Sequence, residues 1–259
     1  MVHMADETTS DRTYRFVNRV FATVFRILRL RITVQGEEHL PTSGPGVIAC
    51  NHTSYIDFTF VGYAARSRGR FVRFMCKRSI FDSRISGPSM RAMRHIPVYR
   101  PSGAVAYRQG LQRLADGELI CNFPEATISH SFLLRPLKLG AAALALRQQV
   151  PLIPAIVWGS HRIATVDRRY SLRPGKAVSI LIGEPIYPAP GDSRESLNAE
   201  LRTRMAELLD SAIDTYPDQP RGDKDRWWLP HDRSGTAPDP VAGARLDHEG
   251  LTRIGELFD

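Results

Sequence analysis

The sequence reads GVIACNHTSYID at residues 46–57, and this stretch decides the fold. Gly46–Cys50 is a short run of small and apolar residues, which is typical of a buried strand. Polar residues follow it and mark a loop, and the apolar spacing of Tyr55–Ala65 then predicts a helix. A strand, a loop and a helix in this order form the repeating unit of α/β proteins.

The same alternation continues along the chain. Further apolar runs predict strands at Arg73–Cys76, Ile96–Tyr99, Glu118–Phe123, Leu152–Trp158 and Ala177–Ile182. Four helical segments are predicted between these strands. The first is a helical region that Gly87 and Pro88 interrupt, and the second runs from Ser102, as its N-cap, to Asp116. The third is Leu137–Gln149, and the fourth is a long helix from Asp192 or Ser193 to about Tyr216. We therefore expect residues 32–216 to form an α/β domain with a mainly parallel central sheet flanked by helices.

Residues 1–31 are expected to form an N-terminal amphipathic helix. Residues 1–10 are polar and should fray, and the helix is predicted from Asp11 to Leu30. Its basic side chains fall within an arc of roughly 80°; they are Arg15, Arg19, Arg26 and Arg29. Apolar residues cover the opposite side. The helix could pack on the domain, or it could lie at a membrane surface where arginines meet lipid phosphates, and both could hold along its length.

Residues 217–259 are expected to form an irregular C-terminal tail. Between Pro217 and Ala244 the composition shifts to Pro, Asp, Arg and Gly, which leaves little to bury. The segment Trp227–Leu229 could pin this tail to the domain. A short helix is predicted near Leu251–Phe258.

The 259-residue chain has a formal net charge of +8, which favours an anionic partner. Nucleic acid, a phosphorylated substrate and an acidic membrane all fit that charge. We expect no nucleic acid, because the arginines form no stripe interleaved with exposed aromatic residues. The three cysteines lack metal-ligand spacing, which predicts no metal site and a reducing compartment. Neither a signal peptide nor an apolar run of about 18 residues is recognised, so we expect a cytoplasmic protein, peripheral on the inner face of the cell membrane.

His52 and Asp57 are the first candidates for chemistry. A catalytic histidine needs a partner that fixes its tautomer and stabilises the imidazolium formed when it takes a proton. Five positions apart in one helix, two side chains diverge by about 140° and do not meet. They converge only if His52 lies in the loop and Asp57 lies in the first turns of the helix. The alternative is that His52 merely caps the loop.

A second group of candidates follows the predicted strand Glu118–Phe123. Pro124 ends the strand pairing and displays Glu125 at its carboxyl end, with Thr127 and Ser129 nearby. Open α/β sheets bind ligands at such ends. An ordinary turn with a solvated carboxylate is the alternative.

Two cations and one apolar segment complete the candidates. Arg100 ends an apolar run that starts at Ile96, and Lys77 follows the strand Arg73–Cys76. Both could bind a phosphate monoester, or they could form surface ion pairs. Val150–Ala155 could line a pocket or belong to the core.

The order of these stretches resembles the glycerolipid acyltransferase family, whose type member is 1-acyl-sn-glycerol-3-phosphate acyltransferase. That family carries an NHxxxxD box, an apolar run ending in Arg, an FPEGTRS-like box and a V-P-hydrophobic-P segment. The corresponding blocks here are Asn51–Asp57, Ile96–Arg100, Phe123–Ser129 and Val150–Pro154, and Gly183–Ile186 is similar to the family's closing strand. The resemblance covers roughly residues 32–190.

The resemblance implies an O-acyltransferase. His52 would deprotonate the acceptor hydroxyl, Asp57 would orient His52, and the alcohol would attack an acyl thioester directly. The substrate-binding residues would be Lys77, Arg100, Glu125, Thr127 and Ser129, and the pocket-lining residues Asn51, Pro124 and Pro154. The donor would be a thioester of coenzyme A or of acyl carrier protein, and the acceptor a lysophospholipid at an anionic membrane surface. No cofactor or metal is implied, because the thioester is already activated.

The third block departs from the family pattern at two positions. Ala126 stands where the family has Gly, and Ile128 stands where it has the Arg credited with binding the acceptor phosphate. His130, Arg135 or Lys138 could replace that Arg. Lysophosphatidate is the expected acceptor, and the alternatives are glycerol 3-phosphate, another lysophospholipid or a glycolipid hydroxyl. A catalytically silent membrane-binding member of the fold is a further alternative.

Overall fold

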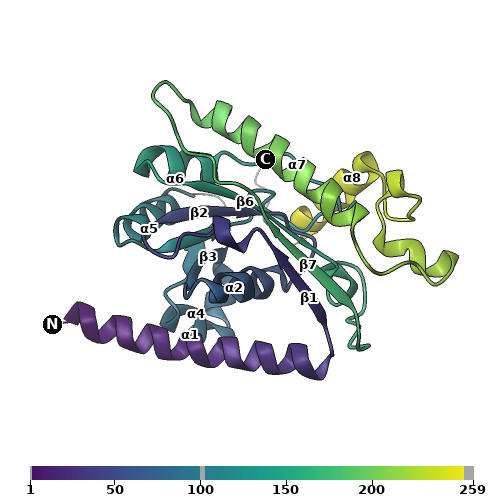
Figure 1. Ribbon diagram of the computed structural model, residues 1–259, viewed down its shortest axis with the longest axis horizontal. Helices are drawn as coiled ribbons and strands as arrows, with labels where there is room; N and C mark the ends of the chain where they lie inside the picture. Colours follow the sequence, from purple (N-terminus) through teal and green to yellow (C-terminus); the bar gives the residue numbers. More distant parts are fainter. Residues whose placement is uncertain (1, 100–102, 254–259) are drawn as a thin grey trace.

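The structure, a computed structural model, describes residues 2–99 and 103–253, with side chains for 11–99 and 103–252. Within these residues, seven strands form one central sheet (Figure 1). They are β1 (Arg31–Gln35), β2 (Gly46–Cys50), β3 (Val72–Lys77), β4 (Ile96–Val98), β5 (Leu119–Asn122), β6 (Leu152–Trp158) and β7 (Ala177–Ile182). The strand order is β1-β7-β6-β2-β5-β3-β4, and every neighbouring pair is parallel except β6 and β7. The expected α/β fold with a mainly parallel sheet is confirmed.

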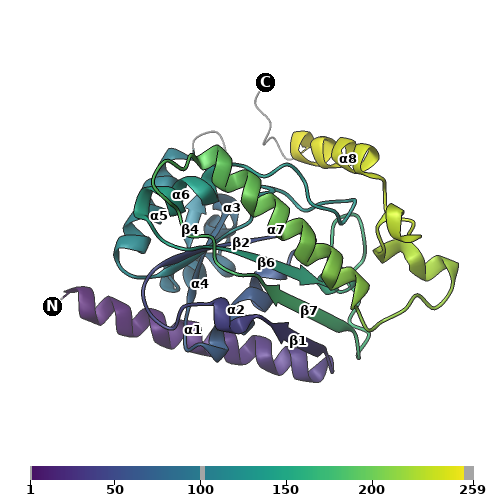
Figure 2. The same cartoon turned by 45° about the horizontal axis from the view of Figure 1, so that its top comes forward.

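Helices cover both faces of this sheet. They are α1 (Val2–Ile27), α2 (Asp57–Ser67), α3 (Arg78–Asp82), α4 (Ser86–Ala92), α5 (Ala104–Ala115), α6 (Gly140–Gln148), α7 (Arg194–Asp214) and α8 (Pro240–Arg253). Short 3-10 helices are η1 (Glu37–His39), η2 (Ser160–Arg162), η3 (Asp223–Trp228) and η4 (His231–Arg233). Helices α5, α6 and α7 lie on one face, and α1 and α2 lie on the other (Figures 1 and 2).

The central strand β2 shows why the sheet needs both layers. All five of its residues are buried. Successive side chains of a strand point to opposite faces. Val47 and Ala49 accordingly join the core under α5, α6 and α7, whereas Ile48 and Cys50 join the core under α1 and α2. A continuous apolar run is the expected sequence for a strand buried on both faces.

Strand β1 was not expected from the sequence. It is the edge strand beside β7, and its residues alternate between exposed and half-buried, so its apolar signal is weak. A turn at Gly36 follows it, with φ of 72°. A Cβ atom at Gly36 would lie 2.0 Å from the carbonyl oxygen of Ile182, so this approach of the chain to β7 requires glycine.

Helix α1 begins at Val2, earlier than predicted, and runs across the α2 side of the sheet (Figure 1). The hydroxyl of Tyr14 donates a hydrogen bond of 2.8 Å to the carbonyl of Val72. The ring of Phe25 stacks on Phe60, with centroids 4.7 Å apart and planes at 5°. Part of the apolar surface of α1 therefore packs on the domain. Another part is exposed, and this exposed stripe consists of Phe16, Val20, Val24 and Ile27.

The C-terminal segment is more regular than the sequence predicted. Helix α8 starts at Pro240. The expectation that the chain is irregular as far as Ala244, with a helix only near Leu251–Phe258, was therefore wrong. Residues 254–259 lie outside the described residues. Asp239 caps α8, since its Oδ1 accepts the backbone N–H groups of Val241 and Ala242 at 2.8 and 2.9 Å. An Asp before a Pro is a helix-start signal that the sequence did contain.

Tertiary contacts also hold the chain before α8. Trp228 of η3 is buried, and its ring lies 5.5 Å from that of Tyr216. The predicted pinning of the tail by Trp227–Leu229 is thus confirmed for Trp228. The Ser193 cap of α7 is confirmed too, because its hydroxyl accepts the N–H of Ser196 at 2.9 Å.

We expect Phe25→Ala to lower the free energy of unfolding by about 3–5 kcal/mol, because it removes a buried ring from between α1 and α2. Phe25 is 6% exposed, whereas Phe16 on the same helix is 66% exposed. The matched control Phe16→Ala should change the free energy of unfolding by no more than about 0.5 kcal/mol. Urea denaturation followed by circular dichroism measures both. Equal losses in the two variants would contradict this account of how α1 is held.

Candidate active site

The loop between β2 and α2 starts from a buried amide. Asn51 follows β2, and its side chain replaces a backbone pairing with β6: its Nδ2 donates to the carbonyl of Val157 at 3.1 Å, and the N–H of Val157 donates to its Oδ1 at 2.7 Å. Asn51 therefore fixes where the loop leaves the sheet. Its predicted place at a pocket wall is not seen, because the side chain is buried and its amide is occupied by β6.

Asp57 is the first residue of α2, and its carboxylate is fully buried. Its Oδ2 accepts hydrogen bonds from Nδ1 of His52 at 3.0 Å and from the backbone N–H groups of Thr53 at 2.9 Å and Ser54 at 2.8 Å. Its Oδ1 accepts the hydroxyl of Ser160 at 2.5 Å. The loop thus wraps around one carboxylate, and the predicted meeting of His52 with Asp57 across a bend is confirmed.

The imidazole of His52 is oriented with one nitrogen inward. A carboxylate only accepts hydrogen bonds, so Nδ1 carries the proton that it shares with Asp57, and Nε2 has a free lone pair. Within the described residues, no hydrogen bond occupies Nε2. The ring stacks on Phe123, with centroids 4.5 Å apart and planes at 29°. The side chain is 23% exposed, so an incoming hydroxyl could reach Nε2.

Glu125 braces the same loop from the neighbouring strand. Its Oε1 accepts the backbone N–H of His52 at 2.7 Å, and its Oε2 accepts the N–H of Arg135 at 2.9 Å. The backbone N–H of Ser129 also donates to the carbonyl of His52 at 2.9 Å. Glu125 is only 2% exposed, and burial raises the pKa of its carboxyl group to about 8 against the hydrogen bonds that favour the anion. The structure therefore places Glu125 behind His52, where it positions the loop.

The other residues of the third block occupy different places. Ser129 is buried, and its hydroxyl donates to the carbonyl of Leu133 at 2.8 Å. Thr127 is half-buried. Ala126 adopts a left-handed conformation with φ of 62°. Glycine adopts this conformation freely, whereas alanine adopts it at a cost of about 1 kcal/mol, so the glycine of the family pattern would suit this position. Ile128 is buried.

Two predicted pocket-lining residues belong to the core. Pro154 lies in the middle of β6, and its ring is near Gly183 and Leu208 of α7, on the sheet face opposite α2. Its placement at a pocket wall was therefore wrong. Pro124 is buried as well, and its carbonyl accepts the N–H of Lys138 at 2.8 Å.

Lys77 and Arg100 are the two residues predicted to bind the acceptor phosphate, and the structure describes only Lys77. Lys77 ends β3, which β5 separates from β2, so Lys77 lies at the same carboxyl edge of the sheet as His52. Arg100 lies outside the described residues. The two stay predicted ligands of an acceptor phosphate.

The proposed substitutes for the missing block arginine are already paired. His130 contacts Asp247 of α8 through Nδ1 at 2.6 Å and Asp167 through Nε2 at 3.1 Å. Burial opposes its protonation, but these two carboxylates raise the pKa of His130 overall. Arg135 forms an ion pair with Asp247 at 2.6 Å. His130 and Arg135 are thus both bound to carboxylates. Lys138 is the exposed one of the three candidates.

The role of the turn after β6 was not expected from the sequence. Besides Ser160, this turn contributes Ala164, whose carbonyl accepts the hydroxyl of Ser54 at 2.5 Å, and Thr165, whose hydroxyl donates to the carbonyl of Thr53 at 2.8 Å. The available signal was Gly159, directly after the strand that neighbours β2. Its φ is 94°, and a Cβ atom there would lie 2.5 Å from a backbone oxygen, so the turn requires glycine.

Known acyltransferases resemble this chain in sequence. A family model described as Acyltransferase matches residues 31–158. The chain is 29% identical over 200 residues to a chloroplastic 1-acyl-sn-glycerol-3-phosphate acyltransferase of Brassica napus, which covers 76% of this chain and 56% of that relative. It is 26% identical over 201 residues to 1-acyl-sn-glycerol-3-phosphate acyltransferase of Bacillus subtilis, covering 77% of this chain and 94% of that relative. The chain thus spans a little over half the length of the plant relative and nearly all of the bacterial one.

A solved structure shares the fold. The crystal structure of the 1-acyl-sn-glycerophosphate acyltransferase PlsC from Thermotoga maritima matches with a TM-score of 0.66 and 21% sequence identity, over 85% of each chain. The matched family model begins at β1 and ends with β6, and so it contains the His52–Asp57 loop and the Glu125 brace. Residues 31–158 of this chain thus match the Acyltransferase family model, and the relatives it resembles are 1-acyl-sn-glycerol-3-phosphate acyltransferases.

Proposed function

We propose that this chain is an O-acyltransferase that moves a fatty acyl group from an acyl thioester to a glycerolipid hydroxyl. The observation that carries the proposal is the hydrogen bond of 3.0 Å between Nδ1 of His52 and the buried Asp57, which leaves Nε2 of a partly exposed imidazole able to take a proton. A base held in this way is positioned before the substrate arrives.

In the proposed reaction, Nε2 of His52 removes the proton of the acceptor hydroxyl while the hydroxyl oxygen attacks the thioester carbonyl carbon. The tetrahedral intermediate then breaks its carbon–sulfur bond, and the leaving thiolate takes the proton back from the imidazolium. Asp57 stabilises the imidazolium between the two steps. The products are an ester and a free thiol, with no covalent acyl-enzyme.

The acceptor that the relatives' names support best is lysophosphatidate, whose acylation gives phosphatidate for phospholipid synthesis. One observation favours a different headgroup: Ile128 is apolar and buried where the family pattern has an arginine. Glycerol 3-phosphate, another lysophospholipid or a glycolipid hydroxyl is therefore the second candidate acceptor. Lys77 and Arg100 are the proposed phosphate ligands, and Thr127 the proposed contact nearer to His52.

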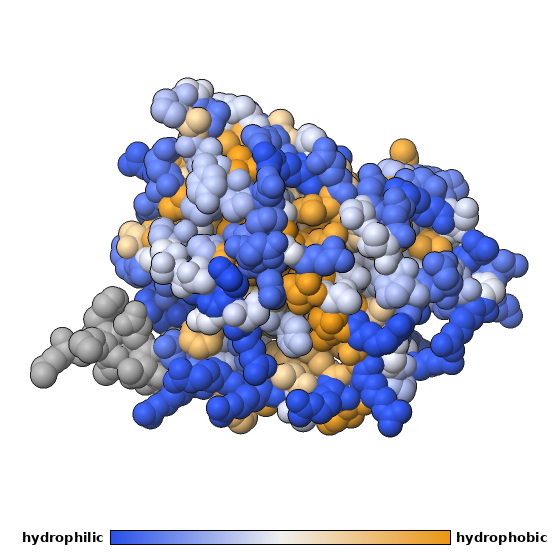
Figure 3. Space-filling model, in the orientation of Figure 1, coloured by the Kyte–Doolittle hydropathy of each residue, from blue (hydrophilic) through white to orange (hydrophobic). Residues whose placement is uncertain are grey.

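We also propose that the chain works on the inner, cytoplasmic face of the cell membrane, with α1 at the lipid surface. Within the described residues, no helix has the length and apolar composition to cross a bilayer. Helix α1 instead exposes its apolar stripe together with the arginines Arg15, Arg19 and Arg26. Hydrophobic atoms appear among the blue side chains along the lower edge of Figure 3, where α1 lies. Such a surface suits anionic lipid.

We expect His52→Ala to lower kcat by about 10²–10⁴ while the fold is retained, because the general base is lost. Release of free thiol and mass spectrometry of the product measure the transfer with lysophosphatidate and with the alternative acceptors. His231 is exposed in η4, so His231→Ala is the matched control and should keep full activity. Undiminished turnover in His52→Ala would remove the general-base role and with it the proposed mechanism.

The Glu125 carboxyl should make stability depend on pH. Its pKa is raised from 4.5 to about 8 in the folded chain, so the folded state binds more protons than the unfolded state between these values. The free energy of unfolding should therefore fall as pH rises from about 5 to 8. In Glu125→Gln this part of the pH dependence should vanish. Denaturant titrations of both proteins at several pH values, compared as a difference, measure it, and parallel curves would refute the assignment.

The exposed stripe of α1 can be tested by introducing negative charge. Phe16→Glu together with Ile27→Glu should strongly reduce sedimentation with anionic liposomes, because both side chains are exposed and would enter the lipid surface as carboxylates. Val241→Glu is the control, since Val241 is an exposed apolar residue of α8, far from α1 (Figure 2). If the α1 variant sediments like the control, α1 only packs on the domain.

A further inference from the structure

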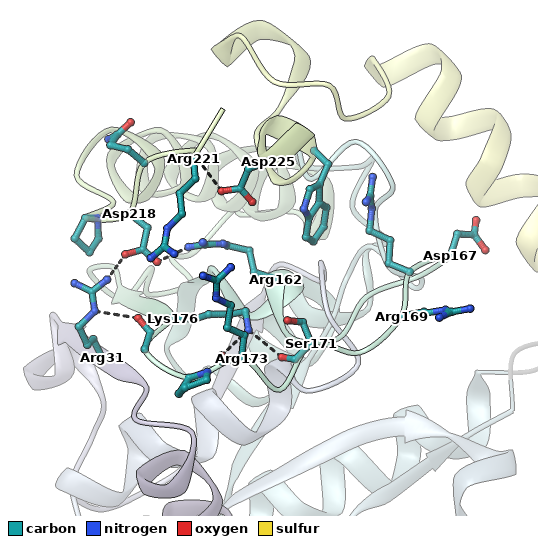
Figure 4. A pocket seen from close by; sticks show the side chains of 16 residues that line it. Arg31, Arg162, Asp167, Arg169, Ser171, Arg173, Lys176, Asp218, Arg221 and Asp225 are labelled. Carbon is teal, nitrogen blue, oxygen red and sulfur yellow. Dashed lines mark hydrogen bonds and ion pairs between the residues drawn. The ribbon is translucent and has the colours of Figure 1, made fainter. Parts of the chain in front are cut away.

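A cavity with an unusual charge lies near the His52 loop. It is a cleft of about 690 Å³ at the end of the sheet where β1 and β7 begin (Figure 4). We call it the arginine cleft. Its basic lining residues are Arg31, Arg162, Arg168, Arg169, Arg173, Lys176 and Arg221, and its acidic ones are Asp167, Asp218 and Asp225. Seven basic and three acidic side chains line the cleft, so its lining has a net charge of +4.

Part of this charge is fixed by the fold. Arg31 and Arg162 both pair with Asp218. Lys176 is only 8% exposed, and its ammonium group donates to the carbonyls of Ser171 at 2.9 Å and Arg173 at 2.7 Å. These two bonds use two of its three donors. The third stays available at the base of the cleft.

Among the described residues, Arg168 lies over the ring of Trp227, with its guanidinium carbon 4.1 Å from the ring centroid, and two further cations have no side-chain partner. The guanidinium groups of Arg173 and Arg221 form neither ion pair nor hydrogen bond there, and Figure 4 shows both side chains directed towards the centre of the cleft, whereas Arg169 points away. Burial, followed by the charges of Arg162 and Arg173, lowers the pKa of Lys176 to about 8. These cations therefore repel one another, and a bound anion would relieve that repulsion.

The cleft shares a wall with the candidate active site. Ser160, which donates to Asp57, and Arg162, which lines the cleft, belong to the same 3-10 helix η2. Further along this wall, the ring of Tyr170 lies 6.4 Å from that of Tyr55 in the His52 loop. A ligand held in the cleft could thus extend a flexible arm along the wall to His52.

We infer that the arginine cleft binds the phosphorylated nucleotide end of a coenzyme A thioester, which makes coenzyme A the carrier of the acyl donor. This inference rests on the proposed acyl transfer. The nucleotide end carries a 3′-phosphate and a pyrophosphate, so its several negative charges match the net charge of +4 and the two inward arginines, Arg173 and Arg221, better than a single phosphate monoester does. Arginine also binds phosphate in a bidentate manner. A volume of this size is typical of small-molecule sites, whereas the convex surface of a carrier protein would not enter it.

The test uses the full chain and adenosine 3′,5′-bisphosphate as the probe. Arg173→Gln combined with Arg221→Gln should weaken binding of the probe about tenfold or more by calorimetry. The same variant should raise KM for an acyl-coenzyme A to a similar extent, but should leave KM unchanged for the matching S-acyl-N-acetylcysteamine, which lacks the nucleotide. The control, Arg66→Gln with Arg108→Gln, removes two exposed charges from α2 and α5, outside the cleft, and should behave like the unmodified chain.

Several results would overturn the inference. Unchanged probe binding in the cleft variant, equal KM effects on both thioesters, or inorganic phosphate binding as tightly as the probe would each do so. Loss of sedimentation with phosphatidate vesicles at unchanged probe affinity would assign the cleft to a lipid headgroup instead. If neither thioester supports turnover but the probe still binds and the cleft variant weakens it, the proposed acyl transfer fails while the anion site stands.

Discussion

The structure around His52 depends on a single buried carboxylate. Asp57 has lost its contact with water, so its charge must be met by protein donors, and four of them converge on it from His52, Thr53, Ser54 and Ser160. An unpaired charge at this depth would be very costly. The same bonds that satisfy the carboxylate bend the loop, fix the imidazole and tie the loop to the turn after β6. The need to satisfy one charge therefore determines the local backbone as well as the geometry of the candidate base.

Two further buried side chains extend this principle. Asn51 replaces a backbone pairing between β2 and β6, and Glu125 joins the amides of His52 and Arg135. Each is a polar group whose bonding capacity is spent inside the protein. Together with Asp57 they connect β2, β5 and β6 at the carboxyl edge of the sheet. A site built on such fully bonded residues holds its geometry without a substrate.

The basic side chains of the protein fall into two groups, those paired with carboxylates and those that are not. Some arginines are bound to carboxylates inside the fold, as Arg135 is to Asp247 and Arg162 is to Asp218. Others gather on α1 and in the arginine cleft, where they face outwards or into a hollow. The acidic residues of the C-terminal segment matter here, because Asp218 and Asp247 decide which cations stay available. Net charge alone could not reveal this division, since it counts paired and unpaired groups alike.

The sequence by itself determined the α/β class, the central strands and the meeting of His52 with Asp57, because apolar runs, helical spacing and a local five-residue interval carry that information within short windows. It did not reveal the edge strand β1, whose half-buried residues give a weak pattern, and it placed α8 too late despite Asp239 and Pro240. Only the tertiary structure decided that Ser160 completes the carboxylate, that Glu125 and Pro154 face inwards, and that arginines from residues 31 to 221 enclose one cleft. These outcomes depend on which segments lie side by side, and contacts between residues a hundred positions apart leave no mark in the local pattern.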